Sequence, residues 1–389
     1  MQSLGVVISG MGVVSACGKN IPETLDNLGA GIRNYSPVSL FETKLDYPVF
    51  EVKGIGYGDA KTMRTLELAF IAAGEAMEES GLKNRLGDLR IGVCMGTTIA
   101  SQLNDTDFYR EYKLKGSASM RSIERYLKSN LAEALSEKFG AHGPASTVVN
   151  ACSSGTDAIG VGLSWLKADL CDVVICGGAD ELSRVPLAGF GSLGVLSELP
   201  CKPFDQERAG LNLGEGAGVI IIEKEEMLRK RGRKAHLYLS GYGLAADGYH
   251  LTAPRPDGSG LELALSFAMQ EAGINPGQVS FVNAHGTATL DNDLVEGNVL
   301  RKFFGPGVKF LSTKGYTGHT LGAAGGIEAV FAALGLLHGW IPQSAGFNKA
   351  DDAIGISPVT KKTMVSEKYA ISTSLAFGGN NSAIVIARE

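Results

Sequence analysis

The chain has 389 residues, of which 44% are hydrophobic and 20% charged, with 52 Gly and 13 Pro. This composition excludes disordered, collagen-like and coiled-coil proteins, and the length predicts two or three domains. A net charge of −5 argues against a nucleic-acid binder. Apolar runs fall short of the ~18 residues of a membrane span, and no signal peptide is visible at the N-terminus. We therefore expect a cytoplasmic protein without nucleic-acid or membrane partners.

The six cysteines are scattered along the chain. They form no Cys-x-x-Cys pair, and no histidine stands at a metal-ligand spacing from them. This pattern predicts neither a disulfide framework nor a zinc site, so no bound metal is expected.

The expected elements, taken in chain order, occur twice. Segments in the front of the chain have counterparts, in the same order, in the rear. The pairs are 6–12 with 237–243, 77–82 with 269–274, 95–98 with 285–289, 152–155 with 319–322, and 218–222 with 382–386. This self-similarity indicates an internal duplication.

Each copy reads as strand, helix, strand, turn, strand, helix and closing strands. β-Branched runs such as 172–175 favour strands buried on both faces. The alternation predicts a mainly parallel sheet within a duplicated α/β fold, layered α/β/α/β/α, with domains 1–233 and 234–389. Two Rossmann domains are the alternative, but the segment 10–15 lacks the third glycine of the dinucleotide fingerprint.

Cys152 is the candidate nucleophile. It follows a short apolar strand at 147–151 and precedes a segment with helical spacing at 156–167. A helix N-terminus favours a thiolate, so we expect the pKa of this thiol to be lowered. The alternative reading, an inert buried cysteine, is kept for the other five.

Two histidines in the rear copy could meet this cysteine. His285 follows the strand 279–283, and His319 occupies the position that corresponds to Cys152. An approximate two-fold relation between the copies would bring all three together as Cys-His-His. Because a helix N-terminus disfavours imidazolium, His319 should be neutral and able to donate from Nε2 to an oxyanion.

Other residues could support this centre. Lys314 and Glu328 flank His319 in sequence and could form a buried ion pair, unless both are surface residues. The glycine-rich loop 376–381 could supply backbone amides to an oxyanion hole at Phe377 and Gly378, with Phe377 as a gate.

Motifs along the whole chain resemble the β-ketoacyl-acyl carrier protein synthases, particularly the KAS I/II group. The motifs are Asn-Ala-Cys-Ser-Ser-Gly (150–155), Pro-Phe-Asp (203–205) with Leu-Gly-Glu-Gly-Ala-Gly (213–218), His-Gly-Thr-Ala-Thr (285–289), Ser-Thr-Lys-Gly-Tyr-Thr-Gly-His (312–319) and Phe-Gly-Gly-Asn-Asn (377–381). The resemblance implies a thiolase-like fold, a homodimer, and decarboxylative Claisen condensation of an acyl-enzyme with malonyl-acyl carrier protein in fatty acid elongation. It implies no cofactor beyond the carrier's 4′-phosphopantetheine.

The resemblance also assigns roles to residues. Cys152 resembles the acylated nucleophile, His285 and His319 the pair that acts on malonyl thioester, and Lys314 with Glu328 the supporting ion pair. The other expected roles are pantetheine binding by Thr287 and Thr289, an acyl pocket at Thr98 and Ile99, and carrier-protein contacts by Lys61, Arg64 and Arg208.

Some alternatives stay open. Asn380 stands where many relatives have Thr. A ketosynthase of a polyketide or aryl-polyene-type pigment pathway would share this pattern. A non-catalytic chain-length factor would lack Cys152. A thiolase would need a second cysteine near the C-terminus, and none follows Cys201. A KAS III-type initiator is disfavoured by His319.

Overall fold

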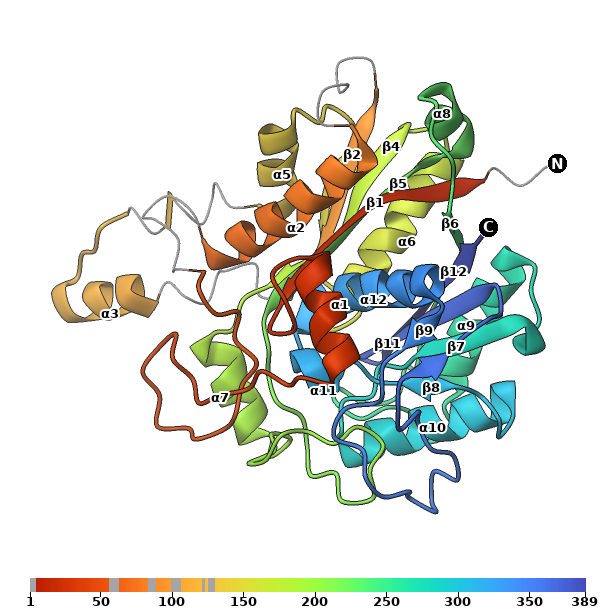
Figure 1. The fold of residues 1–389 in the computed structure, drawn as a ribbon. Helices are drawn as coiled ribbons and strands as arrows, with labels where there is room; N and C mark the ends of the chain where they lie inside the picture. The colour runs from red at the N-terminus through yellow and green to blue at the C-terminus, as the bar shows by residue number, and fades with distance from the viewer. Residues whose placement is uncertain (1–4, 56–62, 83–88, 99–105, 121–122, 125–129) are drawn as a thin grey trace.

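The computed structural model describes residues 5–55, 63–82, 89–98, 106–120, 123–124 and 130–389 (Figure 1). The elements up to residue 230 are β1 (Val6–Ser15), α1 (Ile21–Ala30), α2 (Arg64–Ser80), β2 (Ile91–Gly96), α3 (Thr106–Lys115), α5 (Leu131–Phe139), β3 (Ala145–Val148), α6 (Ser154–Lys167), β4 (Val173–Asp180), α7 (Arg184–Ser192), β5 (Gly216–Lys224) and α8 (Glu225–Lys230).

The elements after residue 236 form a second series. They are β6 (Leu237–Ala246), α9 (Ser259–Ala272), η3 (Pro276–Gln278), β7 (Val279–Asn283), α10 (Leu290–Phe304), β8 (Phe310–Leu311), α11 (Lys314–Thr317), η4 (Leu321–Ala323), α12 (Ala324–His338), β9 (Trp340–Ile341), β10 (Thr363–Met364), β11 (Tyr369–Ala376) and β12 (Asn380–Arg388). The expected domain boundary after residue 233 lies in the connection between α8 and β6, and its position stays a prediction.

Ten strands form one sheet whose two halves have the same topology. The order is β3-β2-β4-β5-β1 in the first half and continues as β6-β12-β11-β7-β8 in the second. If only the strands of this sheet are numbered within each half, and each half is read from its outer edge inward, both run 3-2-4-5-1, and the short pairing of β1 with β6 joins them. The duplication predicted from the sequence repeats is therefore present in the fold.

The expectation of a mainly parallel sheet is wrong. β2 is parallel to β3 and β4, and β7 is parallel to β8 and β11. However, β5 is antiparallel to β1 and β4, as β12 is to β6 and β11. For β11 and β12 the reason is the three-residue connection, since parallel neighbours need a long crossover. The sheet is mixed.

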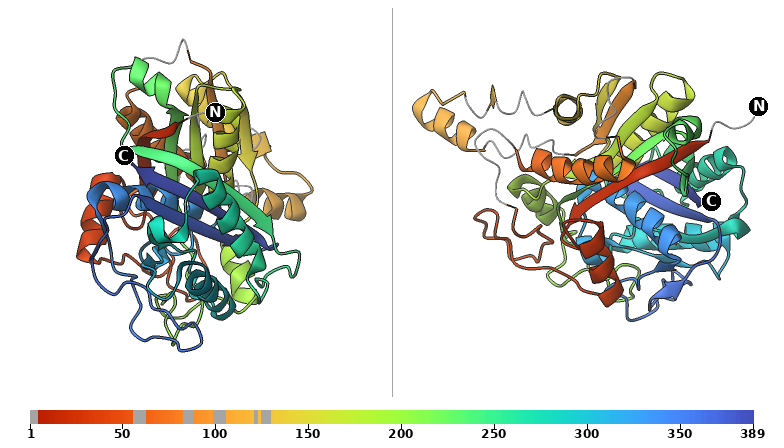
Figure 2. Two further views of the ribbon diagram at one scale, coloured as in Figure 1. Left: turned by 90° about the vertical axis from the view of Figure 1, so that its right-hand side faces the viewer. Right: turned by 45° about the horizontal axis from the view of Figure 1, so that its top comes forward.

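The layering α/β/α/β/α is confirmed. α2 packs on β1, β4 and β5, and α9 packs on β6 and β12, so these helices form outer layers. α6 and α12 contact each other and strands of both halves, which places them in the middle layer. In the right view of Figure 2, α3, drawn in light orange, projects from the body of the protein.

The repeated Gly-x-Gly pairs explain how the outer helices fit. A Cβ added at Gly10, Gly12, Gly241 or Gly243 would lie between 2.0 and 2.2 Å from a backbone oxygen of α2 or α9. Real Cβ contacts are never so short. The helices can therefore pack this closely on the strands only because these four positions are glycine. The motif therefore serves helix packing, as a duplicated fold requires, and not dinucleotide binding.

The central helix α12 is strongly apolar. Leu321–His338 has the length and hydropathy of a membrane span, with a mean hydropathy of 1.5 over 18 residues, but 89% of it is buried inside the protein. Its glycines permit close packing, because a Cβ at Gly326 would lie 2.3 Å from the Gly218 carbonyl oxygen in β5. This segment is a core helix of the fold.

We predict that Gly326→Ala destabilises the protein, since the methyl group would overlap the β5 backbone. Overpacking of this kind costs about 1–3 kcal/mol of unfolding free energy. The matched control is Gly74→Ala in α2, where a Cβ meets nothing within 4 Å and higher helix propensity should add about 0.5–1 kcal/mol. Denaturant unfolding of both variants measures the difference, and equal stabilities would contradict the packing described here.

Candidate active site

Cys152 lies on a tight turn between β3 and α6. Ala151, just before it, has φ 49°, a left-handed conformation that residues with a side chain rarely adopt. The Ser154 hydroxyl accepts from the Asn150 N–H at 2.8 Å and donates to the Ala151 carbonyl at 2.6 Å. The turn is thus fixed by local hydrogen bonds, and Cys152 sits just before the helix as the sequence predicts.

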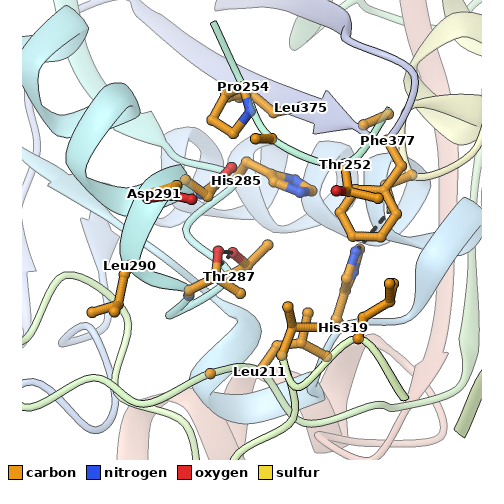
Figure 3. A pocket seen from close by; sticks show the side chains of 18 of the residues that line it. Leu211, Thr252, Pro254, His285, Thr287, Leu290, Asp291, His319, Leu375 and Phe377 are labelled. Carbon is orange, nitrogen blue, oxygen red and sulfur yellow. Dashed lines mark hydrogen bonds between the residues drawn. The ribbon is translucent and has the colours of Figure 1, made fainter. Parts of the chain in front are cut away.

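The structure brings Cys152, His285 and His319 together from the two halves. Cys152 Sγ lies 3.1 Å from His319 Nε2, and the two imidazole rings meet edge to face with centroids 5.3 Å apart. All three residues are at most 5% exposed. Figure 3 shows both histidines pointing into the pocket. The predicted convergence of the copies therefore holds in space.

The expected low pKa of Cys152 is wrong for this structure. Burial raises the pKa of the thiol to about 11, and the Lys314 charge and the Phe377 backbone N–H only partly oppose that effect. The helix N-terminus acts on a group that is out of reach of water, and the loss of hydration outweighs it. Cys152 is therefore a neutral thiol at neutral pH.

Both histidines are neutral, as predicted for His319. Burial, followed by the nearby Lys314 charge, holds the pKa of His285 and of His319 well below the usual range. Lys314 Nζ lies 3.2 Å from His285 Nδ1 and donates to the His285 carbonyl at 2.6 Å. An ammonium can only donate, so Nδ1 accepts and the His285 proton resides on Nε2. That N–H is free to serve a substrate.

Lys314 and Glu328 form the buried ion pair that the sequence predicts. Lys314 Nζ and Glu328 Oε1 are 2.5 Å apart, with side chains 2% and 3% exposed. Burial raises the pKa of Glu328 to about 7, although the Lys314 charge opposes that rise. The pair places a balanced charge beside His285.

The glycine-rich loop between β11 and β12 closes one side of the site. The Phe377 N–H donates to Cys152 Sγ, and this hydrogen bond lowers the thiol pKa against the effect of burial. The Phe377 ring stacks on the ring of Phe190 in α7, with the two ring centroids 5.4 Å apart. The Gly378 N–H donates to the Leu251 carbonyl at 2.8 Å, so Gly378, in contrast to our expectation, has no free amide for an oxyanion. Phe377 alone keeps that candidate role in this loop.

A pocket of about 320 Å³ leads to the three residues. Thr287 and Thr289 line it, and their hydroxyl oxygens are 2.9 Å apart. Thr287 is labelled in Figure 3. Thr98 is not among the lining residues; its hydroxyl donates to the Ala151 carbonyl at 3.1 Å and so braces the cysteine turn. Ile99 lies outside the described residues.

Two of the expected carrier-protein contacts are wrong. Arg64 is 1% exposed and holds Glu215 with two hydrogen bonds of 2.8 and 2.6 Å. Arg208 is 6% exposed and pairs with Asp351 at 2.6 Å. Both guanidinium groups are occupied inside the protein and cannot meet a partner's surface. Lys61 lies outside the described residues.

Three further residues shape the site and were not found from the sequence. Asp180, at the end of β4, accepts from the Thr98 N–H at 2.8 Å and the Gly322 N–H at 2.7 Å, which ties the two halves together. Glu296 of α10 accepts from the His285 N–H at 2.8 Å. The sequence signal for Asp180 was a carboxylate at the end of a buried strand, and the signal for Glu296 was a carboxylate on the apolar face of a helix. For Phe190 the sequence offered no such signal.

Asn380 connects the glycine-rich loop to the cysteine turn. Its side-chain amide donates to Asn150 Oδ1 at 2.6 Å. Asn150 in turn donates to Asp157 Oδ2 at 2.5 Å, within α6. Asn380 thus supplies a contact between the elements that carry Phe377 and Cys152.

Among the described residues, no group of three or more His, Cys, Asp and Glu side chains is arranged to hold a metal ion. The six cysteines are free and buried.

The raised pKa of Cys152 predicts a pH dependence of alkylation. Thiolate is the reactive form, so the rate of iodoacetamide labelling should rise about tenfold per pH unit from pH 7 to pH 9, because both values lie below the pKa. Peptide mass spectrometry checks the site and the rate. Cys152→Ser is the control and should abolish labelling of residue 152, whereas a labelling rate that reaches a plateau near pH 7 would show a thiolate and contradict the neutral thiol.

Family models match most of the chain. The model described as Beta-ketoacyl synthase, N-terminal domain, matches residues 4–227, and the model described as Beta-ketoacyl synthase, C-terminal domain, matches residues 236–348. The 3-oxoacyl-[acyl-carrier-protein] synthase 2 of Staphylococcus aureus (strain MRSA252) is 33% identical over an alignment that covers 100% of this chain and 99% of that protein.

Solved structures agree. The ishigamide ketosynthase/chain length factor superposes with a TM-score of 0.94 at 27% identity, covering 99% of both chains. A structure of a type II PKS acyl-carrier protein in complex with its ketosynthase bound to the hexaketide has a TM-score of 0.91 at 26% identity, covering 100% of both. The chain therefore belongs to the β-ketoacyl synthase family and is an acyltransferase.

Proposed function

We propose that this protein is a 3-oxoacyl-[acyl-carrier-protein] synthase of fatty acid elongation. It takes an acyl group onto Cys152 and condenses it with malonyl-acyl carrier protein, with loss of carbon dioxide. The observation that carries the proposal is the buried 3.1 Å contact of Cys152 with His319, next to a His285 whose Nε2 bears the proton. The same name belongs to a relative 33% identical over the whole chain.

The first half-reaction is acyl transfer. Cys152 Sγ attacks the acyl thioester, and the pantetheine sulfur leaves with the proton that the thiol loses. The backbone N–H groups of Cys152 and Phe377 stabilise the oxyanion of the tetrahedral intermediate. The pocket's burial limits water that would hydrolyse the acyl-enzyme.

The second half-reaction is decarboxylative condensation. The malonyl carboxylate leaves as carbon dioxide, and its electron pair forms an enolate whose oxygen accepts hydrogen bonds from His285 and His319 Nε2–H. The enolate carbon attacks the acyl carbonyl on Cys152, and the thiolate leaves. That thiolate then takes one proton from solvent, because its pKa of about 11 makes the thiol the stable form at neutral pH.

We propose an acyl carrier protein as the partner and no resident cofactor. Substrates would arrive on the carrier's 4′-phosphopantetheine. The hydroxyl groups of Thr287 and Thr289 would donate hydrogen bonds to the carbonyl oxygens of its amides. The pocket position of both threonines supports this role. We place the reaction in the cytoplasm.

We further propose a homodimer that pairs through β3. This strand stands at one end of the sheet order, next to β2, and Val149, directly after it, is 62% exposed. An open strand edge presents unpaired N–H and C=O groups, and a two-fold axis would let the β3 strands of two copies pair with each other.

Two alternatives differ from this proposal in one feature each. A chain-length factor lacks the nucleophile, and the presence of Cys152 beside two neutral histidines argues against that role. A polyketide or pigment ketosynthase would share the site and differ in the acyl groups accepted. Intact-mass detection of the acyl groups transferred to Cys152 from a panel of acyl carrier proteins distinguishes elongation of fatty acyl chains from these.

A pair of variants tests the division of labour in the site. Cys152→Ala should lose condensation, by about 10³-fold or more as expected for a covalent nucleophile, yet retain malonyl decarboxylation, since both histidines remain. His319→Ala should lose decarboxylation by about 10²-fold, as for an oxyanion-hole donor. Product mass and release of labelled carbon dioxide are the two measurements.

Thermal unfolding of both variants provides the control for folding. Full condensation by Cys152→Ala would remove Cys152 from the proposed mechanism. Unchanged carbon dioxide release by His319→Ala would do the same for His319.

A further inference from the structure

Asp157 is a buried carboxylate that the proposed mechanism does not use. It lies in the first turn of α6 and is 4% exposed. In the part of the chain that the structure describes, its oxygens accept hydrogen bonds from a side-chain amide, two serine hydroxyls and a phenol, none of them a cation. A buried carboxylate without a cation beside it costs folding free energy unless neutral donors satisfy it. Asp157 has such a set of donors, and they come from three separate parts of the fold.

Two of the donors belong to the turn that carries Cys152. The Asn150 side-chain amide donates to Asp157 Oδ2 at 2.5 Å, and the Ser153 hydroxyl donates to the same oxygen at 2.7 Å. Asn150 lies two residues before Cys152, and Ser153 lies directly after it. The carboxylate therefore holds this turn on both sides of the nucleophile.

The other two donors belong to the rear half of the chain. The Tyr242 hydroxyl in β6 donates to Asp157 Oδ1 at 3.0 Å, and the Ser382 hydroxyl in β12 donates to the same oxygen. The tyrosine ring fits against α6 because residue 160 is glycine, where a Cβ would lie 2.4 Å from the ring. Burial, followed by the Asp157 charge, raises the pKa of Tyr242, so the phenol keeps the proton that it donates. Asp157 thus ties the cysteine turn to two strands of the other half.

The carboxylate also sets the direction of a chain of hydrogen bonds. A carboxylate only accepts, so the Asn150 amide must turn its NH₂ group toward Asp157 and its oxygen away from it. That oxygen, Oδ1, accepts from the Asn380 side-chain amide at 2.6 Å. Asn380 begins β12, at the end of the loop that carries Phe377. Asp157 therefore orients two amides in series, and the second of them holds the Phe377 loop.

We propose that Asp157 is a positioning residue for the oxyanion hole of acyl transfer. This inference rests on the proposed function, in which the backbone N–H groups of Cys152 and Phe377 stabilise the tetrahedral intermediate. These two groups belong to different halves of the chain, and Asp157, Asn150 and Asn380 form a side-chain link between the segments that carry them. Such donors are effective when their separation is fixed before the reaction begins.

The two half-reactions should respond differently when this link is lost. Acyl transfer uses the two backbone N–H groups, whereas malonyl decarboxylation uses the Nε2–H groups of His285 and His319. Among the described residues, the hydrogen bonds of both histidines involve neither Asp157 nor the two asparagines linked to it. Loss of the link should therefore slow the first half-reaction alone, whereas a general loss of packing would slow both.

The test variant is Asp157→Asn, which keeps the shape of the side chain but replaces one acceptor by a donor. The rate of acyl transfer to Cys152 at saturating acyl-acyl carrier protein should fall about tenfold, less than the ~10²–10³-fold that follows removal of an oxyanion donor. The carrier concentration that gives half the maximal rate should stay within about twofold of the wild-type value, because the link does not bind the carrier. Decarboxylation of malonyl-acyl carrier protein should also stay within about twofold. Quenched time courses read by intact mass, and release of labelled carbon dioxide, measure the two rates.

A second variant, Asn380→Ala, breaks the same link without removing the buried carboxylate, so the test does not depend on the folding of Asp157→Asn. Acyl transfer should again slow, while decarboxylation stays unchanged. The double variant should be no slower than the slower single variant, since both residues act through Asn150.

Glu75→Gln is the matched control. Glu75, in the outer helix α2, also accepts hydrogen bonds from neutral groups, the N–H groups of Val13 at 3.0 Å and Ile21 at 2.8 Å. Its substitution removes a comparable carboxylate away from the site and should leave both half-reactions unchanged. Thermal unfolding of every variant shows whether a change in rate accompanies a change in stability.

The remaining outcomes overturn the inference in recognisable ways. Acyl transfer at the wild-type rate in Asp157→Asn or in Asn380→Ala would show that the link does not position the oxyanion hole. Equal slowing of acyl transfer and decarboxylation would show that Asp157 only supports packing, and additive effects in the double variant would show that the two residues act separately. A wild-type protein that accepts no acyl group from any carrier protein would instead overturn the proposed function, and this inference with it.

Discussion

The close approach of α6 and α12 at the centre of the molecule is the constraint on which the site depends. A Cβ at Gly155 would lie 2.7 Å from the Gly322 carbonyl oxygen, and a Cβ at Gly325 would lie 2.4 Å from the Thr156 backbone nitrogen, so the two helix starts meet only because Gly155 and Gly325 have no side chains. That approach brings Cys152 Sγ to 3.1 Å from His319 Nε2. Asp180 then fixes the relative position of the halves through hydrogen bonds to both.

The same central position sets the protonation states. Residues in the middle layer have little access to water, so the thiol and both imidazoles are held in their neutral forms. The positive charge on Lys314 is balanced by its ion pair with Glu328. The site thus contains neutral hydrogen-bond donors, which suit a substrate that itself develops negative charge.

Local patterns predicted more of this site than of its surroundings. The strand–turn–helix setting of Cys152, its counterpart at His319 and the duplication depend on short segments that repeat, and all are present in the fold. The burial of Arg64 depends on Glu215, and that of Arg208 on Asp351, residues distant in sequence. No spacing rule reveals such partners.

The pKa of Cys152 was predicted wrongly for the same reason. The position of a residue at a helix end can be read from the local sequence, whereas desolvation of its side chain depends on the whole fold. The directions of β5 and β12 were predicted wrongly, because the sequence patterns did not show that the β4–β5 and β11–β12 connections reverse the direction of the chain.

The shared strand order of the halves has a consequence for how unlike groups come to face each other. Cys152 and His319 occupy corresponding positions, one per copy. In a symmetric pair of identical chains, corresponding positions must hold the same amino acid, so two sulfurs or two imidazoles would face each other at the axis. Joining the copies in one polypeptide removes that restriction. A nearly symmetric scaffold can then carry an asymmetric chemistry, with an electron-pair donor on one side and a proton donor on the other.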